Sequence, residues 1–372
     1  MKIIIVGTAY PLRGAFAQLN ATLAWHLSKK HSVEIVSFKR QYPKLLFPGK
    51  TQIDPSKRLF DVPTKALIDS INPFSWISAA RYIRQQRPDV LIFRYWIPFF
   101  APCFGVISSL TRNWTKARIL FICDNILPHE RRPGDVALAR FAFRFADYFL
   151  VHSRSVGEDL NRFVRNPKYV LAPLPIDSIF GKPIAKLRAR KLLSMRDQKI
   201  ILFFGYVRRY KGLHHLLEAM PKILERFKLK LLIVGEFYEE EERYKKQITD
   251  LGITQSVVMR SEYVTNEEVG VYFSACDVVV LPYVSATQSA VVPVAYYFDK
   301  PVITTDVGGL AEDVANGKTG IIVPPGRPDM IADAVIQYYT KNKEKSFAPN
   351  VKKAKKRHGW PNYVASIEEL IQ

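Results

Sequence analysis

The chain has 372 residues, of which 48% are hydrophobic and 24% are charged. This length and composition exclude a disordered chain and predict two domains, each with its own core. The three cysteines, Cys103, Cys123 and Cys276, are far apart and form no CxxC pair. This spacing argues against a disulfide framework or a zinc site and favours a reducing compartment. The apolar run within residues 1–7 is too short for a signal peptide and is expected to be the first strand.

Positive charge is concentrated in the first half of the chain. Residues 1–200 hold 33 Lys and Arg against 13 Asp and Glu, whereas residues 201–372 hold 22 against 21. Such segregation indicates that the first half faces an anionic partner. An anionic membrane surface is the favoured partner. The alternative is that the positive charge of residues 1–200 binds no specific partner. Nucleic acid is disfavoured, because no RRM, KH, zinc-finger or helix-turn-helix signature accompanies the charge.

In the first half, apolar strands alternate with helical patterns, which predicts a parallel, doubly wound sheet. Strands are expected at 3–7, 32–38, 90–94, 118–123 and 148–152, and helices at 15–30, 73–86 and 137–146. Residues 40–70 carry four prolines and a glycine and are expected to be loops. The most apolar segment, 95–110, is shorter than the ~20 residues of a membrane-spanning helix, so no such helix is expected. It is either a buried loop and helix or an interfacial patch that touches lipid.

A second series of strands and helices follows a region rich in proline and glycine. That region, 171–198, is expected to link an N-terminal domain of residues 1–170 to a C-terminal domain of residues 199–358. Strands are expected at 199–204, 230–234, 257–259, 278–281, 302–304 and 320–323, and helices at 213–226, 239–251, 266–275, 291–298 and 329–339. A last helix is expected near 363–371, and residues 359–372 are expected to pack back towards the N-terminal domain.

Two segments of the second half have the pattern of phosphate-binding turns. Residues 203–212, FFGYVRRYKG, are an apolar strand that ends in glycine and a cationic loop, and residues 301–314, PVITTDVGGLAEDV, are a strand followed by a Gly-Gly turn. A strand that opens onto a glycine turn and a helix N-terminus is a common place for phosphate in α/β proteins. Arg208 and Lys211 add fixed positive charge there. The pattern predicts an anionic, nucleotide-linked ligand, the alternative being a solvated cationic loop.

The order and spacing of four blocks, 203–221, 229–248, 261–283 and 299–329, resemble the GT-B glycosyltransferases. More narrowly, the chain resembles the family 4 retaining glycosyltransferases of glycosyltransferase group 1, and residues 6–27 and 121–132 extend the resemblance to essentially the whole chain. It implies the α/β class, with two facing doubly wound Rossmann-like domains and parallel sheets. It also implies a UDP- or GDP-linked sugar bound mainly by the C-terminal domain, an acceptor on the N-terminal side, and neither metal nor cofactor.

The resemblance also implies roles for individual residues. Arg208 and Lys211 match a cationic pair that stabilises the leaving diphosphate in place of a divalent cation. Gly235 and Glu236 match the place where the nucleotide is held, and Tyr263–Val264 matches the segment along the base. The implied donor-binding set is Gly14, Arg208, Lys211, Gly235, Glu236, Tyr263, Val264, Gln288, Ser289, Ala290 and Val291. Alternatively, Gly235, Glu236, Tyr263 and Val264 only form ordinary turns at strand ends. Gly14 is alternatively a glycine of a loop without a binding role.

The chain departs from the family pattern at two glutamates that stand eight residues apart before the KPVI strand. By spacing from Lys300, these positions are Ala286 and Val294. Neither side chain can contact a sugar hydroxyl as a carboxylate does. Gln288 and Ser289 are expected to supply neutral hydrogen bonds instead, and the amides of residues 289–291 are expected to face the diphosphate.

A second departure lies at the acceptor side, where many family members carry a histidine after a strand. The matching residue is Asp124, which is expected to face the acceptor and to act in catalysis. The alternative is that Asp124 only organises the turn of residues 123–128. His129 is a further acceptor-side candidate, and it alternatively caps local structure.

Together these features predict a retaining, metal-independent glycosyltransferase at the inner face of the cell membrane. It would be cytoplasmic and peripherally associated, and would use a lipid-linked or polysaccharide acceptor in synthesis of a bacterial surface glycan such as lipopolysaccharide. Two alternatives stay open. One is a non-catalytic glycosyltransferase-like binding subunit, and the other is an epimerase-like enzyme on a GT-B scaffold.

Overall fold

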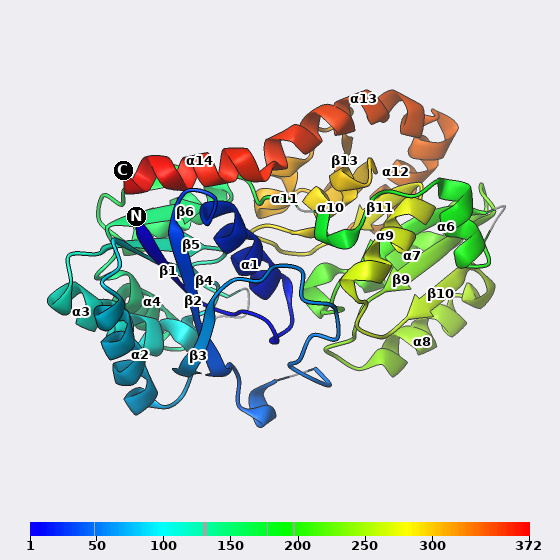
Figure 1. Cartoon of the computed structure of the whole chain (residues 1–372). Coiled ribbons are helices and arrows are strands. Elements are labelled where there is room, and N and C mark those ends of the chain that lie inside the picture. The colour runs from blue at the N-terminus through cyan, green and yellow to red at the C-terminus, as the bar shows by residue number, and fades with distance from the viewer. Residues whose placement is uncertain (48, 129–131, 177, 196–197) are drawn as a thin grey trace. The chain divides into compact units, whose positions relative to one another are not determined.

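The computed structural model describes the chain except for residues 48, 129–131, 177 and 196–197 (Figure 1). The chain divides into two compact units. Unit 1 comprises Met1–Leu174 together with Trp360–Gln372, and unit 2 comprises Pro175–Gly359. Within the described residues, no helix combines the length and the apolar character needed to cross a membrane.

The described part of unit 1 forms a seven-stranded parallel sheet with the order β3-β2-β1-β4-β5-β6-β7. Its strands are β1 (Lys2–Val6), β2 (Ser32–Arg40), β3 (Thr64–Asp69), β4 (Val90–Tyr95), β5 (Arg118–Cys123), β6 (Tyr148–Val151) and β7 (Tyr169–Leu171). The central strands β1, β4 and β5 are apolar along almost their whole length, because helices cover both faces of the sheet.

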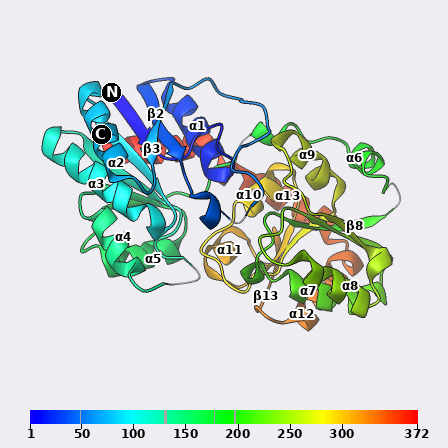
Figure 2. The same cartoon turned by 90° about the horizontal axis from the view of Figure 1, so that it is seen from below.

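The helices of unit 1 lie on both sides of this sheet (Figure 2). They are α1 (Ala15–Leu27), α2 (Pro73–Gln86), α3 (Ala101–Trp114), α4 (Asp135–Phe143), α5 (Arg154–Phe163) and α14 (Trp360–Ile371), with short 3-10 turns η1 (Lys44–Leu46) and η2 (Pro98–Phe100). Helices α1 and α14 share one core with the sheet, and α2 to α5 share the other. The C-terminal helix therefore completes the core of unit 1.

Two sequence-based expectations for unit 1 are decided by the structure. Residues 40–70 are not all loop, because Thr64–Asp69 forms the edge strand β3, which pairs with β2. The strand was missed because it follows Pro63 and only Ile68 is fully buried. The apolar segment 95–110 forms η2 and α3, with Phe100, Phe104 and Ile107 fully buried, so the buried interpretation of this segment is confirmed.

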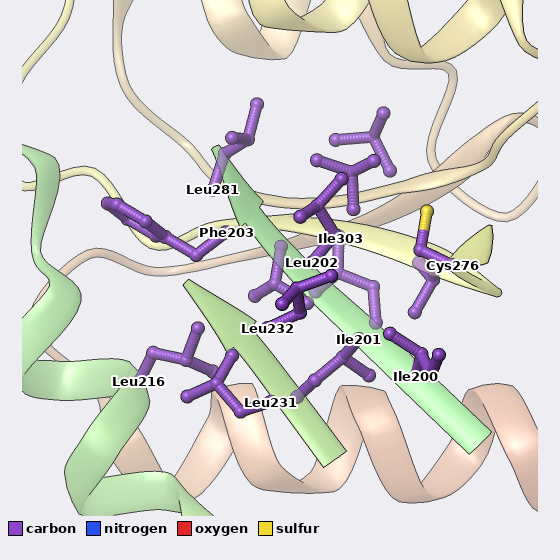
Figure 3. Close-up of a cluster of buried hydrophobic side chains, with 14 of the residues drawn as sticks. Ile200, Ile201, Leu202, Phe203, Leu216, Leu231, Leu232, Cys276, Leu281 and Ile303 are labelled. Carbon is purple, nitrogen blue, oxygen red and sulfur yellow. The ribbon is translucent and has the colours of Figure 1, made fainter. Parts of the chain in front are cut away.

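The described part of unit 2 forms a six-stranded parallel sheet with the order β10-β9-β8-β11-β12-β13. Its strands are β8 (Lys199–Phe204), β9 (Leu229–Val234), β10 (Val257–Arg260), β11 (Val278–Leu281), β12 (Val302–Thr305) and β13 (Gly320–Val323). Figure 3 shows the core at its centre, where Ile201 and Leu202 of β8 lie among side chains of β9 and β12. Both units are thus doubly wound parallel α/β structures, as the alternation of patterns predicted.

The helices of unit 2 also lie on both faces of its sheet (Figure 2). They are α6 (Lys186–Leu192), α7 (Leu213–Leu224), α8 (Glu241–Asp250), α9 (Asn266–Ala275), α10 (Val291–Tyr297), α11 (Gly308–Asp313), α12 (Pro328–Thr340) and α13 (Lys343–Lys355), with 3-10 turns η3 (Ser178–Phe180), η4 (Arg209–Lys211), η5 (Thr254–Ser256) and η6 (Lys356–His358). The segment 171–198 thus contains a helix, α6. Lys186 and Arg190 of α6 hold the buried Asp277 at 2.8 and 2.7 Å.

Candidate functional site

Two glycines bring the carboxyl ends of β8 and β9 into close contact. Gly205 and Gly235 follow these strands with φ of 105° and 144°, values that L side chains rarely adopt. The amide of Gly205 donates to the carbonyl of Val234 at 2.9 Å. A Cβ at Gly235 would stand 2.2 Å from the carbonyl oxygen of Gly205. The backbone conformation and the close approach both require glycine at these positions.

Lys211 stands beside this pair of strand ends. Its Nζ lies 3.0 Å from the position that a Cβ of Gly205 would take, and 5.3 Å from the ring centre of Tyr283. None of the described acidic side chains forms an ion pair with it. Burial lowers the pKa of the Lys211 ammonium, and the nearby charge of Arg208 lowers it further. A partly buried cation without a counter-ion is a typical feature of a binding site for an anion.

Arg208 is exposed and lies on an aromatic support. Its guanidinium carbon is 5.1 Å from the ring centre of Tyr238, a cation–π distance. Tyr238 in turn stacks on Tyr206, with ring centres 4.5 Å apart. Because Tyr206 follows β8 and Tyr238 follows β9, the same two strand ends that position Lys211 also position Arg208.

The predicted nucleoside-side residues follow β9 and β10. The amide of Gly235 donates to the carbonyl of Arg260 at 2.9 Å, so the ends of these strands are adjacent. The side chain of Glu236 is only 4% exposed, and its carbonyl accepts from the amide of Val207 at 2.9 Å. Tyr263 and Val264 are half-buried between β10 and α9. The structure therefore gathers Gly235, Glu236 and residues 263–264 at one edge of the sheet.

The loop between β11 and α10 reaches the same edge. A Cβ at Gly212 would stand 1.9 Å from the carbonyl oxygen of Pro282, and a Cβ at Gly308 would stand 1.8 Å from that of Ala286. The loop is thus held between the turns after β8 and β12. Ala286 is half-buried and Val294 is 6% exposed and part of the core. The two positions without glutamate hold apolar packing instead.

The start of α10 lies next to β8, since Cγ2 of Val291 is 3.9 Å from the Cβ position of Gly205. Ser289 is 7% exposed, and its hydroxyl accepts the amide hydrogen of Val291 at 3.2 Å. Gln288 is half-buried and Ala290 is exposed. Residues 288–291 therefore stand at the site, but the amide of Val291 is bound to Ser289.

The remaining candidates belong to unit 1. Gly14 precedes α1 with φ of 114°, and open space surrounds the position of its Cβ. Asp124 follows β5 with its side chain only 3% exposed, and its amide donates to the carbonyl of Tyr95 at 2.8 Å. His129 lies outside the described residues. The structure thus brings together the unit 2 candidates, while Gly14 and Asp124 lie in the other unit.

Asp124 is part of a buried polar cluster that the sequence did not reveal. Arg94 donates to both of its carboxylate oxygens, at 3.0 and 3.1 Å, and Nε2 of His152 lies 3.3 Å from Oδ1. Tyr363 of α14 stacks on His152, with ring centres 5.8 Å apart, and accepts from Arg94 at 3.5 Å. A charged residue inside the apolar run VLIFRY was the one signal that could have indicated Arg94.

One ring nitrogen of His152 is held by the backbone. Its Nδ1 lies 2.9 Å from the carbonyl oxygen of Ala172, which can only accept, so this nitrogen carries a hydrogen. The other nitrogen, Nε2, is buried and makes no hydrogen bond within the described residues. No group of three or more metal-ligating side chains occurs among the residues that the structure describes.

The chain is similar to known glycosyltransferases. Residues 198–341 match the family model described as "Glycosyl transferases group 1". An uncharacterized glycosyltransferase of Methanocaldococcus jannaschii is 36% identical over 152 residues, which are 40% of this chain and 37% of that protein. The D-inositol 3-phosphate glycosyltransferase of Pseudarthrobacter chlorophenolicus is 30% identical over 285 residues, 71% of this chain and 66% of that protein. The chain therefore matches only part of each relative, from 37% to 66% of the relative's length.

Among solved structures, Anabaena HepE in complex with UDP has a TM-score of 0.79 at 18% identity, and the alignment covers 99% of each chain. At this identity the likeness establishes the fold alone, and it confirms the predicted GT-B fold. The narrower placement in family 4 stays a prediction. Residues 198–341 of the chain thus match the group 1 glycosyl transferases, as the motifs of its second half predicted.

Proposed function

We propose that the protein transfers a sugar from a UDP- or GDP-linked donor to a lipid-linked or polysaccharide acceptor, with retention of configuration. The observation that carries this proposal is Lys211, a partly buried ammonium without an acidic partner among the described residues, beside two glycines that open the backbone. The relatives support it, since one is a D-inositol 3-phosphate glycosyltransferase and HepE was solved with UDP. The acceptor would serve synthesis of a bacterial surface glycan.

In this proposal, Arg208 and Lys211 stabilise the leaving diphosphate. The bond from the anomeric carbon to the diphosphate oxygen breaks, and negative charge develops on the diphosphate. The acceptor oxygen bonds to the anomeric carbon, and the proton of the acceptor hydroxyl passes to the departing diphosphate. A cation in a desolvated place interacts with that charge more strongly than one in water. Lys211 is such a cation, so a divalent metal is not needed for this role.

The other unit 2 residues would hold the rest of the donor. Glu236 and residues 263–264 would line the nucleoside, and Gln288 would face the sugar in place of the glutamates that Ala286 and Val294 replace. The amides of Ser289 and Ala290 would face the diphosphate. The amide of Val291 would join them only if its bond to the Ser289 hydroxyl opens, because that bond occupies it here.

On the acceptor side we propose a role for Asp124, with Gly14 at the donor. Both carboxylate oxygens of Asp124 accept from Arg94, which fixes the orientation in which the carboxylate would meet an acceptor hydroxyl. His129 remains part of this proposal without a structural description. The positive charge of residues 1–200 supports peripheral association with an anionic membrane surface at the cytoplasmic side, where a lipid-linked acceptor would be found.

The test of the proposed function is release of nucleoside diphosphate from UDP- and GDP-sugars, with and without acceptor. A thermal-shift screen with UDP and GDP compounds first identifies the base. We expect slow release of UDP or GDP without acceptor, and its loss in Lys211→Ala.

Two alternatives predict other products. A binding subunit, which the apolar residues at 286 and 294 favour, would be stabilised by the nucleotide and release nothing. An epimerase-like enzyme would release isomers of the free sugar, which chromatography of the products would detect.

A further inference from the structure

Unit 1 exposes four large apolar side chains in the two connections that leave its edge strands β2 and β3. We refer to Leu45, Leu46, Ile71 and Phe74 as the edge patch; their exposed fractions are 95%, 55%, 48% and 80%. The register pairs Arg40, at the end of β2, with Asp69, at the end of β3. The amide of Ser70 donates to the carbonyl of Arg40 at 3.0 Å. Both connections therefore start from neighbouring points at one edge of the sheet (Figure 1).

The first connection, which follows β2, is fixed by contacts at its base. The exposure of Leu45 and Leu46 is therefore a property of an ordered segment. The ring of Tyr42 stacks on Phe99 with centres 5.5 Å apart, and its hydroxyl accepts from Nε1 of Trp96 at 3.2 Å. Gln52 bonds both backbone groups of Tyr42, at 3.2 and 3.0 Å. The amide of Arg13 donates to the carbonyl of Gln52 at 2.9 Å. The turn η1 extends from this base, and none of its residues is buried.

The second connection presents its apolar residues in the same way. Helix α2 begins at Pro73, and the side chain of Asn72 caps it by accepting from the amide of Phe74 at 3.0 Å. The helix buries Trp76, Ala79, Ala80 and Ile83 against the core of unit 1. Phe74 points away from that core and is 80% exposed. The folding of α2 therefore does not use Phe74.

The first connection, which carries Leu45 and Leu46, is rich in basic residues. Residues 39–58 hold six Lys and Arg residues against one acid, Asp54. All six are exposed, whereas Asp54 is 7% exposed. The basic residues are Lys39, Arg40, Lys44, Lys50, Lys57 and Arg58. Of these, Arg40 is paired with Asp69, and Arg58 is paired with Asp61 before the start of β3. Lys39, Lys44 and Lys50 are the exposed cations of the connection that carries Leu45 and Leu46. Exposed leucines that share a connection with cations match an anionic lipid surface, because the cations meet the headgroups while the apolar tips enter the acyl boundary.

We infer that unit 1 docks on anionic membranes through the edge patch, with Leu45, Leu46 and Phe74 inserted among the lipids and Lys39, Lys44 and Lys50 on the headgroups. This inference rests on the proposed membrane association, and it is independent of the proposed sugar transfer. It predicts binding with two components, an electrostatic one that salt removes and an apolar one that salt leaves in place.

The first experiment is co-sedimentation of the full chain with vesicles of phosphatidylglycerol and phosphatidylcholine, compared with pure phosphatidylcholine, at low and high salt. The test variants are Leu45→Ser combined with Leu46→Ser, and Phe74→Ser. The matched control is Leu187→Ser combined with Leu192→Ser on α6, where the two leucines are 71% and 62% exposed in a basic helix of unit 2. All substituted side chains are exposed, so we expect unchanged folding by circular dichroism.

We expect the edge-patch variants to bind anionic vesicles roughly tenfold more weakly, the loss of apolar burial for one or two such side chains. Their residual binding should disappear at high salt, and the α6 control should bind like the parent protein. If the parent protein does not sediment with anionic vesicles, the proposed membrane association itself is wrong. If the parent protein and the edge-patch variants bind the vesicles equally well, the assignment of the edge patch as the docking surface is wrong.

A second measurement reports insertion directly. The three native cysteines are buried, so an environment-sensitive fluorophore attached to Leu45→Cys labels the patch selectively. We expect a blue shift when vesicles are added, and none for the same label at Leu187→Cys. An unshifted signal at residue 45 in a protein that sediments with vesicles would overturn the inference, because the bound surface would then lie elsewhere.

Discussion

Arg94 donates to both carboxylate oxygens of Asp124, at 3.0 and 3.1 Å, where the two side chains are 0% and 3% exposed. The pair is therefore withdrawn from solvent, and each charge depends on the other. A buried charge that loses its partner is costly, whereas replacement of both partners by apolar residues is often tolerated. This asymmetry separates a structural role of Asp124 from a role towards the acceptor.

We predict that Asp124→Asn lowers the free energy of unfolding by about 3–5 kcal/mol, because the guanidinium of Arg94 is left without its counter-ion. The double variant Arg94→Met with Asp124→Leu should regain most of this stability in urea unfolding. If Asp124 also acts on the acceptor, the double variant stays deficient in sugar transfer by roughly 10²-fold although it is stable. Recovery of transfer in the double variant would limit Asp124 to holding the fold.

Lys211→Met should stabilise the protein while it removes function. Burial lowers the pKa of this lysine, which means that the folded state disfavours its charged form, so removal of the charge should raise Tm. Binding of the nucleoside diphosphate should weaken by about 1.5–3 kcal/mol. Lys222→Met on α7, where the side chain is 47% exposed, is the control and should change neither quantity. Unchanged donor affinity in Lys211→Met would exclude the proposed site.

The lowered pKa of Lys211 also predicts a pH dependence of donor binding. The bound diphosphate requires the ammonium, so affinity should fall as pH rises through a value below the ordinary 10.5. Without ligand the sign is opposite, because the unfolded chain keeps the proton longer and stability therefore rises with pH over the same range. Titration calorimetry between neutral and alkaline pH checks the first effect, and Lys211→Met should abolish it.

Gly235→Ala should damage the donor site more than an alanine at another positive-φ glycine. A Cβ at residue 235 would meet the carbonyl oxygen of Gly205 at 2.2 Å, whereas a Cβ at Gly252, whose φ is 66°, meets nothing within 4 Å. We expect a loss of roughly 2–5 kcal/mol for Gly235→Ala and about 1–2 kcal/mol for Gly252→Ala. Equal losses in chemical unfolding would mean that the two strand ends can separate at little cost.

Elements with a continuous apolar pattern could be predicted from the sequence, and elements fixed by distant partners could not. The runs at 200–204 and 278–281 are fully apolar and lie in central strands, so their burial follows from composition. Helix α13 escaped prediction because only Phe347 and Val351 of its residues are buried and Pro349 lies inside it. In the candidate site, the cationic loop was visible as a motif. The partners of Arg94 lie 30 and 269 residues away, and no local pattern reveals such contacts.

Asp313 lies at the end of α11 and is almost fully withdrawn from solvent. Burial raises its pKa from 3.8 to about 7, against the opposing charge of Arg357 and with a small contribution from Glu312. Nε2 of His358 is 3.9 Å from its carboxylate. A raised carboxyl pKa means that the folded state holds the proton more tightly than the unfolded chain. The resulting stability is complete below the unfolded value of 3.8 and is lost as pH rises through about 7.

Asp313→Asn keeps the shape of the side chain and removes the charge. We therefore expect it to raise stability by about 1–4 kcal/mol above pH 7, a gain that fades as pH falls towards 4. Thermal unfolding of both proteins across this pH range measures the effect, and Asp333→Asn, at an exposed position of α12, is the control. If Asp313→Asn raised stability equally at pH 4 and above pH 7, the charge of Asp313 in the folded protein would not change over this range. Burial would then not raise its pKa as we predict.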